Sequence, residues 1–170
     1  MNKTVEKKLN CQINKEFWSA YLYLSMSAYF ERENLPGFAN WMRVQFAEEQ
    51  THALKLIDYI NERGGSVQLF PIDGVDSQWK DAVDVFGVTL KHEKEVTKRI
   101  GKLLECAHNE KDFATYSVLQ WYISEQVEEE ASVGVIFEQL KMVGDDQNGL
   151  LMMDRELASR VFVDATKEGE

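Results

Sequence analysis

Hydrophobic residues recur with the spacing of an α-helix over almost the whole chain. When positions are indexed at 100° per residue, four long stretches each place their apolar side chains on one face. Runs rich in Gly, Pro, Asn and Asp interrupt the pattern near residues 34–37, 64–65, 109–112 and 144–149. The pattern therefore predicts five helices, at about residues 5–32, 36–63, 79–108, 112–143 and 148–162.

The connections between these helices predict how they are arranged. Short turns join the first helix to the second and the third to the fourth, so each pair is antiparallel. The second helix is ~42 Å long at 1.5 Å per residue, and the link over residues 64–78 reaches ~50 Å when extended. The sequence therefore predicts an all-α, single-domain protein over residues 1–170: a four-helix bundle with one long crossover connection and a short fifth helix.

Composition and charge narrow the functional classes. The 170 residues are 44% hydrophobic, which is enough for a core and excludes global disorder. The net charge of −10 argues against nucleic acid and permits cationic partners. The two cysteines are far apart, so neither a disulfide framework nor a zinc ribbon is indicated. The first ten residues lack the apolar core of a secretory signal, and the uncharged stretch 17–30 is too short to span a bilayer. We expect a soluble cytoplasmic protein.

Acidic residues lie where these helices should be apolar. Each of the four long helices places at least one carboxylate on its inward stripe, and the same stretches carry no Lys or Arg. The inward polar residues are Glu16, Glu49, His52, Glu93, Gln126 and Glu129. A single buried Glu is usually paired with a base or bent toward the surface, but four in one core must be protonated or bound to cations. Four carboxylates balance two divalent ions, and carboxylates with one imidazole suit iron or manganese.

Three segments carry a family resemblance, at residues 16–23, 46–52 and 120–130. Ferritin-like carboxylate proteins combine Glu from two helices with Glu-x-x-His from the others, and these segments closely resemble those of bacterial non-haem ferritins. The resemblance implies a two-iron ferroxidase centre. Glu16, Glu49 and His52 would bind the first iron. Glu49 would bridge to a second iron, which Glu93 and Glu129 would complete.

The resemblance assigns further residues around this centre. Tyr23 matches the tyrosine that lies beside the two irons, although ordinary core packing also explains it. Three acids, Glu48, Glu125 and Glu128, match those that bind a third iron, although a solvated acidic face would look the same. At the second Glu-x-x-His position the chain has Gln126-x-x-Glu129. Because the amide replaces a bridging anion, the second iron should be held less tightly and can leave, which favours storage over oxygenation.

Other protein classes with helical bundles differ from an iron-storage ferritin in testable ways. A haem-binding bacterioferritin has a ligand methionine directly after the Glu of its first Glu-x-x-His, and here that residue is Gln50, so we expect no haem. A rubrerythrin-like peroxidase would need C-x-x-C pairs, and a DNA-protecting mini-ferritin usually has a basic tail and no fifth helix. A purely structural helical bundle would explain the periodicity but not the inward acids, and it would neither bind metal nor oxidise ferrous iron. A di-iron oxygenase would retain its iron and form no mineral.

The resemblance implies iron storage and detoxification by a ferroxidase. Fe(II) would be oxidised with O2 or H2O2 and stored as hydrous ferric oxide inside a homo-oligomeric shell of 24 subunits. Animal ferritins have an acidic pair at their three-fold channels, and alignment on Glu125-Gln126 places Tyr116 and Leu119 there. An acidic three-fold entry route is therefore doubtful. The preferred oxidant, the reductant for iron release and the entry path are left open by the sequence.

Overall fold

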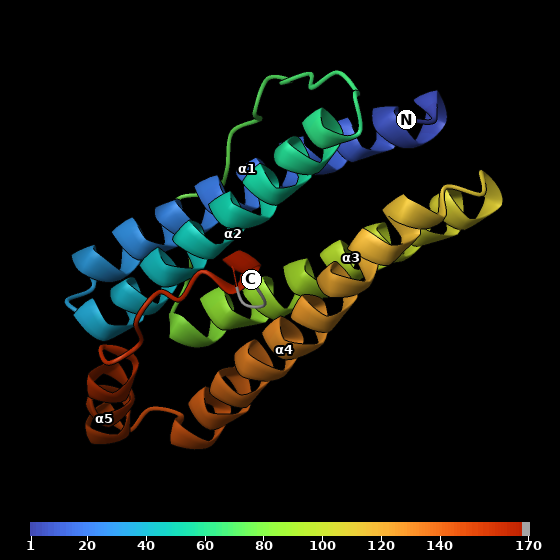
Figure 1. Ribbon diagram of the computed structural model, residues 1–170. Helices are drawn as coiled ribbons and strands as arrows, with labels where there is room; N and C mark the ends of the chain where they lie inside the picture. Colours follow the sequence, from blue (N-terminus) through green and yellow to red (C-terminus); the bar gives the residue numbers. More distant parts are fainter. Residues whose placement is uncertain (168–170) are drawn as a thin grey trace. The chain divides into compact units, whose positions relative to one another are not determined.

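The structure, a computed structural model, describes residues 1–167. Over that range the chain forms five α-helices, a short 3-10 helix and no strand, so the all-α prediction is confirmed (Figure 1). The elements are α1 (Lys3–Arg32), α2 (Pro36–Glu62), α3 (Ala82–Asn109), α4 (Phe113–Val143), α5 (Gln147–Leu157) and the 3-10 helix η1 (Ala165–Lys167). No helix among these residues combines the length and apolar character that a bilayer span requires.

Two compact units share these helices. One comprises Met1–Leu9 and Trp79–Gly144 and so contains α3 and α4; the other comprises Asn10–Gln78 and the chain from Asp145 onward. The second unit contains α2, α5 and most of α1. That both units belong to one domain stays a prediction.

Helices α1 and α2 form an antiparallel pair. Near the turn between them, Ser27 Oγ donates to the main-chain oxygen of Ala39 at 2.9 Å. Farther from the turn, Glu16 of α1 faces Glu49 of α2. The turn itself follows the sequence: Pro36 is the first residue of α2, where its fixed φ suits a helix start and its missing N–H is not needed.

The long connection after α2 follows α1. Side chains of α1 donate to main-chain oxygens of the connection at three levels: Asn10 to Ser66 at 3.0 Å, Ser25 to Asp76 at 2.7 Å and Arg32 to Ser77 at 2.9 Å. From Asn10 to Arg32 a helix rises about 33 Å. The connection therefore runs along most of α1, as the crossover prediction requires.

Helices α3 and α4 form a second antiparallel pair. A Cβ built on Gly87 of α3 would lie 3.2 Å from the Phe137 ring of α4, so the two helices pack closely at one end. At the other end, the rings of His108 and Tyr116 lie 5.9 Å apart across the turn.

The predicted start of the third helix was wrong by three residues. We expected it to begin at about Trp79, but α3 begins at Ala82. Asp81 is extended and its carboxylate accepts a hydrogen bond from Asp84 N at 2.8 Å, so it caps the first turn and fixes where the helix begins. The fourth helix begins as predicted, next to Asp112, whose carboxylate caps its first turn by accepting a hydrogen bond from Thr115 N at 3.2 Å.

The predicted end of the fifth helix was also wrong. We expected it to reach about residue 162, but α5 ends at Leu157. Asn40 Nδ2 lies within hydrogen-bond distance of three main-chain oxygens at this end, those of Leu157, Ala158 and Arg160. Asn40 of α2 thus donates to carbonyls that would accept intrahelical hydrogen bonds if α5 continued. The chain leaves the helix here and runs on along α2.

Candidate metal centre

Helices α1 and α2 bring three predicted ligands together. Glu49 and His52 lie one turn apart on α2, and Glu16 projects from α1. One ligand atom from each lies within 4.8 Å of the other two. All three residues are buried, with exposed fractions of 1%, 4% and 1% for Glu49, His52 and Glu16. The predicted first metal site is therefore assembled within one compact unit.

This donor set fits a hard or borderline divalent cation. Two atoms bound to one ion at about 2.1 Å each are at most about 4.2 Å apart. The three ligand atoms therefore need to move by less than about 1 Å to bind a common ion, which small side-chain rotations allow. Two carboxylates and one imidazole suit iron, manganese or zinc and exclude no first-row metal by themselves.

His52 is in the protonation state that metal binding requires. Its pKa is lowered from 6.5 to about 4; burial is the largest cause, the charge of Lys55 adds to the shift and the charge of Asp164 opposes it. At neutral pH the imidazole is therefore neutral and carries a lone pair. Its Nδ1 lies 3.8 Å from Glu49 Oε2.

A second glutamine supports this site and was missed in the sequence. Gln12 lies one turn before Glu16 on α1 and donates from Nε2 to Glu16 Oε1 at 2.8 Å. Its side chain is buried, so the contact fixes the carboxylate of Glu16. A polar residue four positions before a predicted ligand, on the same helix face, is the signal that could have found it.

Helices α3 and α4 bring the other predicted ligands together. Glu93 of α3 and Glu129 of α4 have carboxylate oxygens within 4.8 Å of each other. Gln126 Nε2 donates to Glu93 Oε2 at 3.1 Å and lies 3.4 Å from the hydroxyl of Thr97. The amide therefore holds Glu93 through its nitrogen, which cannot ligate a metal. A direct ligand role for Gln126 stays a prediction, as does the joining of both ligand sets into one di-iron centre.

The residues predicted around the centre differ in their surroundings. Tyr23 is fully buried on α1. Of the three acids predicted to bind a third iron, Glu128 is exposed while Glu48 and Glu125 are half-buried. Glu48 forms an ion pair with Arg160 at 2.6 Å. This pair was not predicted, because residue 160 was expected to lie within the fifth helix.

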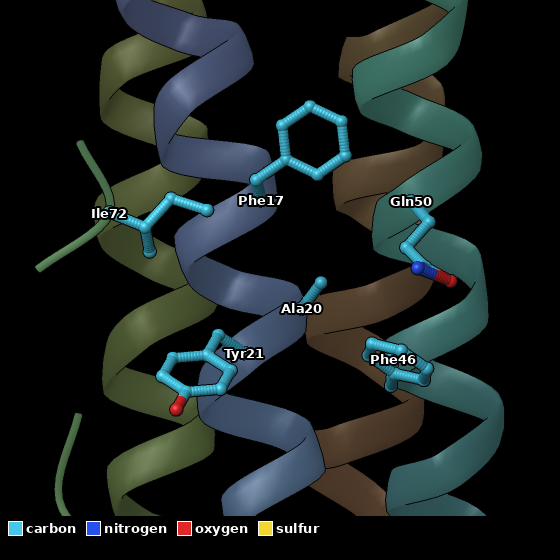
Figure 2. Close-up of a pocket in the computed structure, with 6 residues that line it drawn as sticks. All are labelled: Phe17, Ala20, Tyr21, Phe46, Gln50 and Ile72. Atoms are coloured by element: carbon cyan, nitrogen blue, oxygen red, sulfur yellow. The ribbon is translucent and has the colours of Figure 1, made fainter. Parts of the chain in front are cut away.

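Gln50 lies away from these ligands, in an apolar pocket of about 410 Å³. Figure 2 shows its side chain beside Phe46 of α2, with Phe17, Ala20 and Tyr21 from α1 and Ile72 from the crossover. An amide is a poor iron ligand compared with the thioether expected in a haem-binding relative. The absence of haem stays a prediction.

Tyr116 and Leu119, which align with the acidic pair of the three-fold channels of animal ferritins, differ in burial. Tyr116 is partly exposed, with 37% of its surface accessible, whereas Leu119 is fully buried. Neither residue carries a charge that would attract a cation.

Comparison with known proteins decides the family. The model of the ferritin-like domain matches residues 6–143, most of the chain and parts of both compact units. The chain belongs to the ferritin family. It is 41% identical over 160 residues to a bacterial non-heme ferritin of Bacteroides fragilis, covering 94% of this chain and 99% of the relative. It is 39% identical over 162 residues to one of Staphylococcus epidermidis, covering 95% and 98%.

Solved ferritin structures agree with this assignment. An engineered closed form of the Archaeoglobus fulgidus ferritin matches with a TM-score of 0.95 at 50% identity, covering 96% of this chain and 99% of that one. The open-pore ferritin of the same archaeon matches with a TM-score of 0.94, also at 50% identity, covering 95% and 99%. The chain therefore has the ferritin fold, a four-helix bundle with a short C-terminal fifth helix, and the predicted resemblance is confirmed.

Proposed function

We propose that this ferritin stores and detoxifies iron. It binds Fe(II), oxidises it to Fe(III) with O2 or H2O2, and keeps the product as hydrous ferric oxide inside a shell of identical subunits, 24 in number as in the ferritins that it resembles. Membership of the ferritin family and the non-heme ferritin names of its relatives support this proposal.

The observation that carries the proposal is the buried group of Glu16, Glu49 and His52. Two carboxylates in a site of low dielectric repel each other and attract a cation strongly, because little water screens either interaction. The lowered pKa of His52 keeps its nitrogen available for that cation. A divalent ion therefore relieves the electrostatic cost of burying these side chains.

We infer that a second iron completes the centre. In this proposal Glu49 bridges the two ions, while Glu93 and Glu129 hold the second and Gln126 orients Glu93. Two Fe(II) ions together supply two electrons, which reduce one O2 to H2O2 or one H2O2 to two waters. Tyr23 would lie beside the centre, and Glu48, Glu125 and Glu128 would hold a third iron.

Because Gln126 is neutral, the second iron is bound by fewer negative charges than in a symmetric Glu-x-x-His cage. Weaker binding allows oxidised iron to leave for the mineral. Iron is then a substrate that passes through the centre, and no haem takes part.

Stopped-flow measurement of Fe(II) oxidation tests the proposal. The variants Glu49→Ala and His52→Ala should lose the fast phase, since each removes a ligand of the first iron. Glu62→Ala is the matched control because it removes an exposed carboxylate from the end of the same helix. Wild-type rates in either ligand variant would refute the assignment of the centre.

A further inference from the structure

The chain after α5 forms a strap along α2. This C-terminal strap, residues 158–167, begins where Asn40 holds the end of α5 and includes η1 at its far end (Figure 1). Asp164 of the strap lies close enough to His52 for its charge to raise the pKa of the imidazole. Because Asn40 and His52 are three turns apart on α2, the strap runs from the start of that helix to the level of the proposed iron ligands.

Arg160 anchors the strap through several contacts with one face of α2. Its Nη2 lies 2.6 Å from Glu48 Oε2, and its Nη1 donates to Gln45 Oε1 at 2.8 Å. Its guanidinium carbon lies 4.4 Å from the ring centroid of Trp41, a cation–π contact. About a quarter of the Arg160 side chain and a fifth of the Glu48 side chain remain exposed. The guanidinium is thus held by a carboxylate, an amide and a ring at once.

This ion pair uses a carboxylate that the proposed function assigns to iron. Glu48 directly precedes the bridging ligand Glu49 in the sequence. Its Oε2 accepts a charge-assisted hydrogen bond from Arg160, so the guanidinium occupies one position on this carboxylate and its positive charge repels a metal ion there. A cation at Glu48 must therefore displace the guanidinium or bind more weakly beside it.

We propose that Arg160 is a built-in competitor for the cation at Glu48 and sets the affinity of that position for iron. The inference rests on the proposed iron-binding role of Glu48. With Arg160 docked, iron binds there weakly and passes on; with Arg160 released, Glu48 becomes a stronger ligand. The strap moves away from α2 when the metal takes its place.

Anaerobic titration calorimetry with Fe(II) tests this inference. In Arg160→Gln, which removes the charge but keeps a hydrogen-bonding side chain of similar reach, the site at Glu48 should tighten about tenfold or more, equivalent to at least ~1.4 kcal/mol. In Arg160→Lys, which keeps the charge, the affinity should stay near that of wild type. In the double variant Arg160→Gln with Glu48→Gln, the gain should disappear.

The outcomes separate this inference from the proposed function. If wild type shows the tight sites of Glu16, Glu49 and His52 but Arg160→Gln gives the same isotherm, the inference is wrong and the proposed function stands. A gain that persists in the double variant also overturns it, because Glu48 is then not the ligand. If wild type binds no Fe(II) tightly, the proposed function fails, and the inference fails with it.

Hydrogen exchange provides a second test, whose main measurement uses the unaltered protein. Addition of Zn(II), a redox-inert probe, should speed exchange in residues 161–167, because displacing Arg160 frees the strap. Unchanged exchange at Zn(II) concentrations that saturate the protein would contradict the proposal. In Glu48→Gln the strap should exchange fast already, with no further effect of Zn(II).

Discussion

Asp154 of α5 caps the first turn of α2, and its removal should undock α5. The carboxylate Oδ1 accepts hydrogen bonds from Gly37 N at 2.8 Å and from Phe38 N at 3.0 Å. The residue before α2 is Leu35, whose side chain can accept no hydrogen bond, so α2 takes its cap from a helix more than 110 positions later. A carboxylate at this end also interacts favourably with the helix dipole.

The size of the effect follows from these two bonds. Hydrogen bonds to a charged group contribute about 1.5–3 kcal/mol each. Asp154 is buried, with 7% of its surface exposed, so little water replaces it while α5 stays docked. Asp154→Ala should therefore weaken the docking of α5 by about 3 kcal/mol, taking the low end for each bond. Asp154→Asn keeps the acceptor without the charge and should lose about 1 kcal/mol.

Gly37→Ala should have the same consequence by a different route. A Cβ at this position would lie 1.6 Å from the main-chain oxygen of Asp154, so α5 would have to move away although its carboxylate is intact. Hydrogen exchange over residues 147–157 measures the docking of α5 directly. The control is Glu156→Gln, which removes an exposed charge from the same helix. Protection in Asp154→Ala equal to that in the control would refute the capping argument.

Three further predictions concern the centre and the assembly. The double change Gln126→Glu and Glu129→His should retain more iron after desalting and slow mineral growth in repeated-addition assays. Without metal it replaces the hydrogen bond from Gln126 to Glu93 by two carboxylates about 3 Å apart, so the apo form should be less stable. Removal of the chain from Gly149 onward should weaken the shell or its iron retention while keeping most helicity, and an unchanged shell by sedimentation velocity with unchanged retention would count against this. Because the pKa of His52 is about 4 in the fold and about 6.5 when unfolded, the native state binds fewer protons between these values; the apo protein should lose up to about 3 kcal/mol as pH falls from 6.5 to 4. Denaturant unfolding should show a smaller loss of stability over this pH range in His52→Gln. Equal losses in the variant and the wild type would show that His52 does not cause the pH dependence.

Local signals explain what the sequence predicted correctly. The starts of α2 and α4 were predicted to within one residue because Pro36 and Asp112 act on their own first turns. The inward positions of Glu16, Glu49 and His52 follow from 3.6-residue periodicity, which places them among buried apolar residues whatever the helices pack against. Side chains on one helix face meet those on the facing helix, so a short turn was enough to predict that α1 and α2 share a site.

Only the tertiary structure decided how the C-terminal part of the chain is used. The hydrophobic spacing of residues 158–162 is compatible with a helix, yet α5 ends at Leu157. Asn40 donates to the carbonyl of Leu157, and Arg160 packs on the ring of Trp41 instead of continuing the helix. The cap of α2 by Asp154 and the ion pair between Arg160 and Glu48 join residues more than 110 positions apart. Such contacts depend on which faces meet after the helices pack, and helical periodicity carries no information about that. The sequence by itself therefore determined the fold and the inward positions of the proposed ligands. The ion pair that neutralises Glu48 beside them was decided by packing.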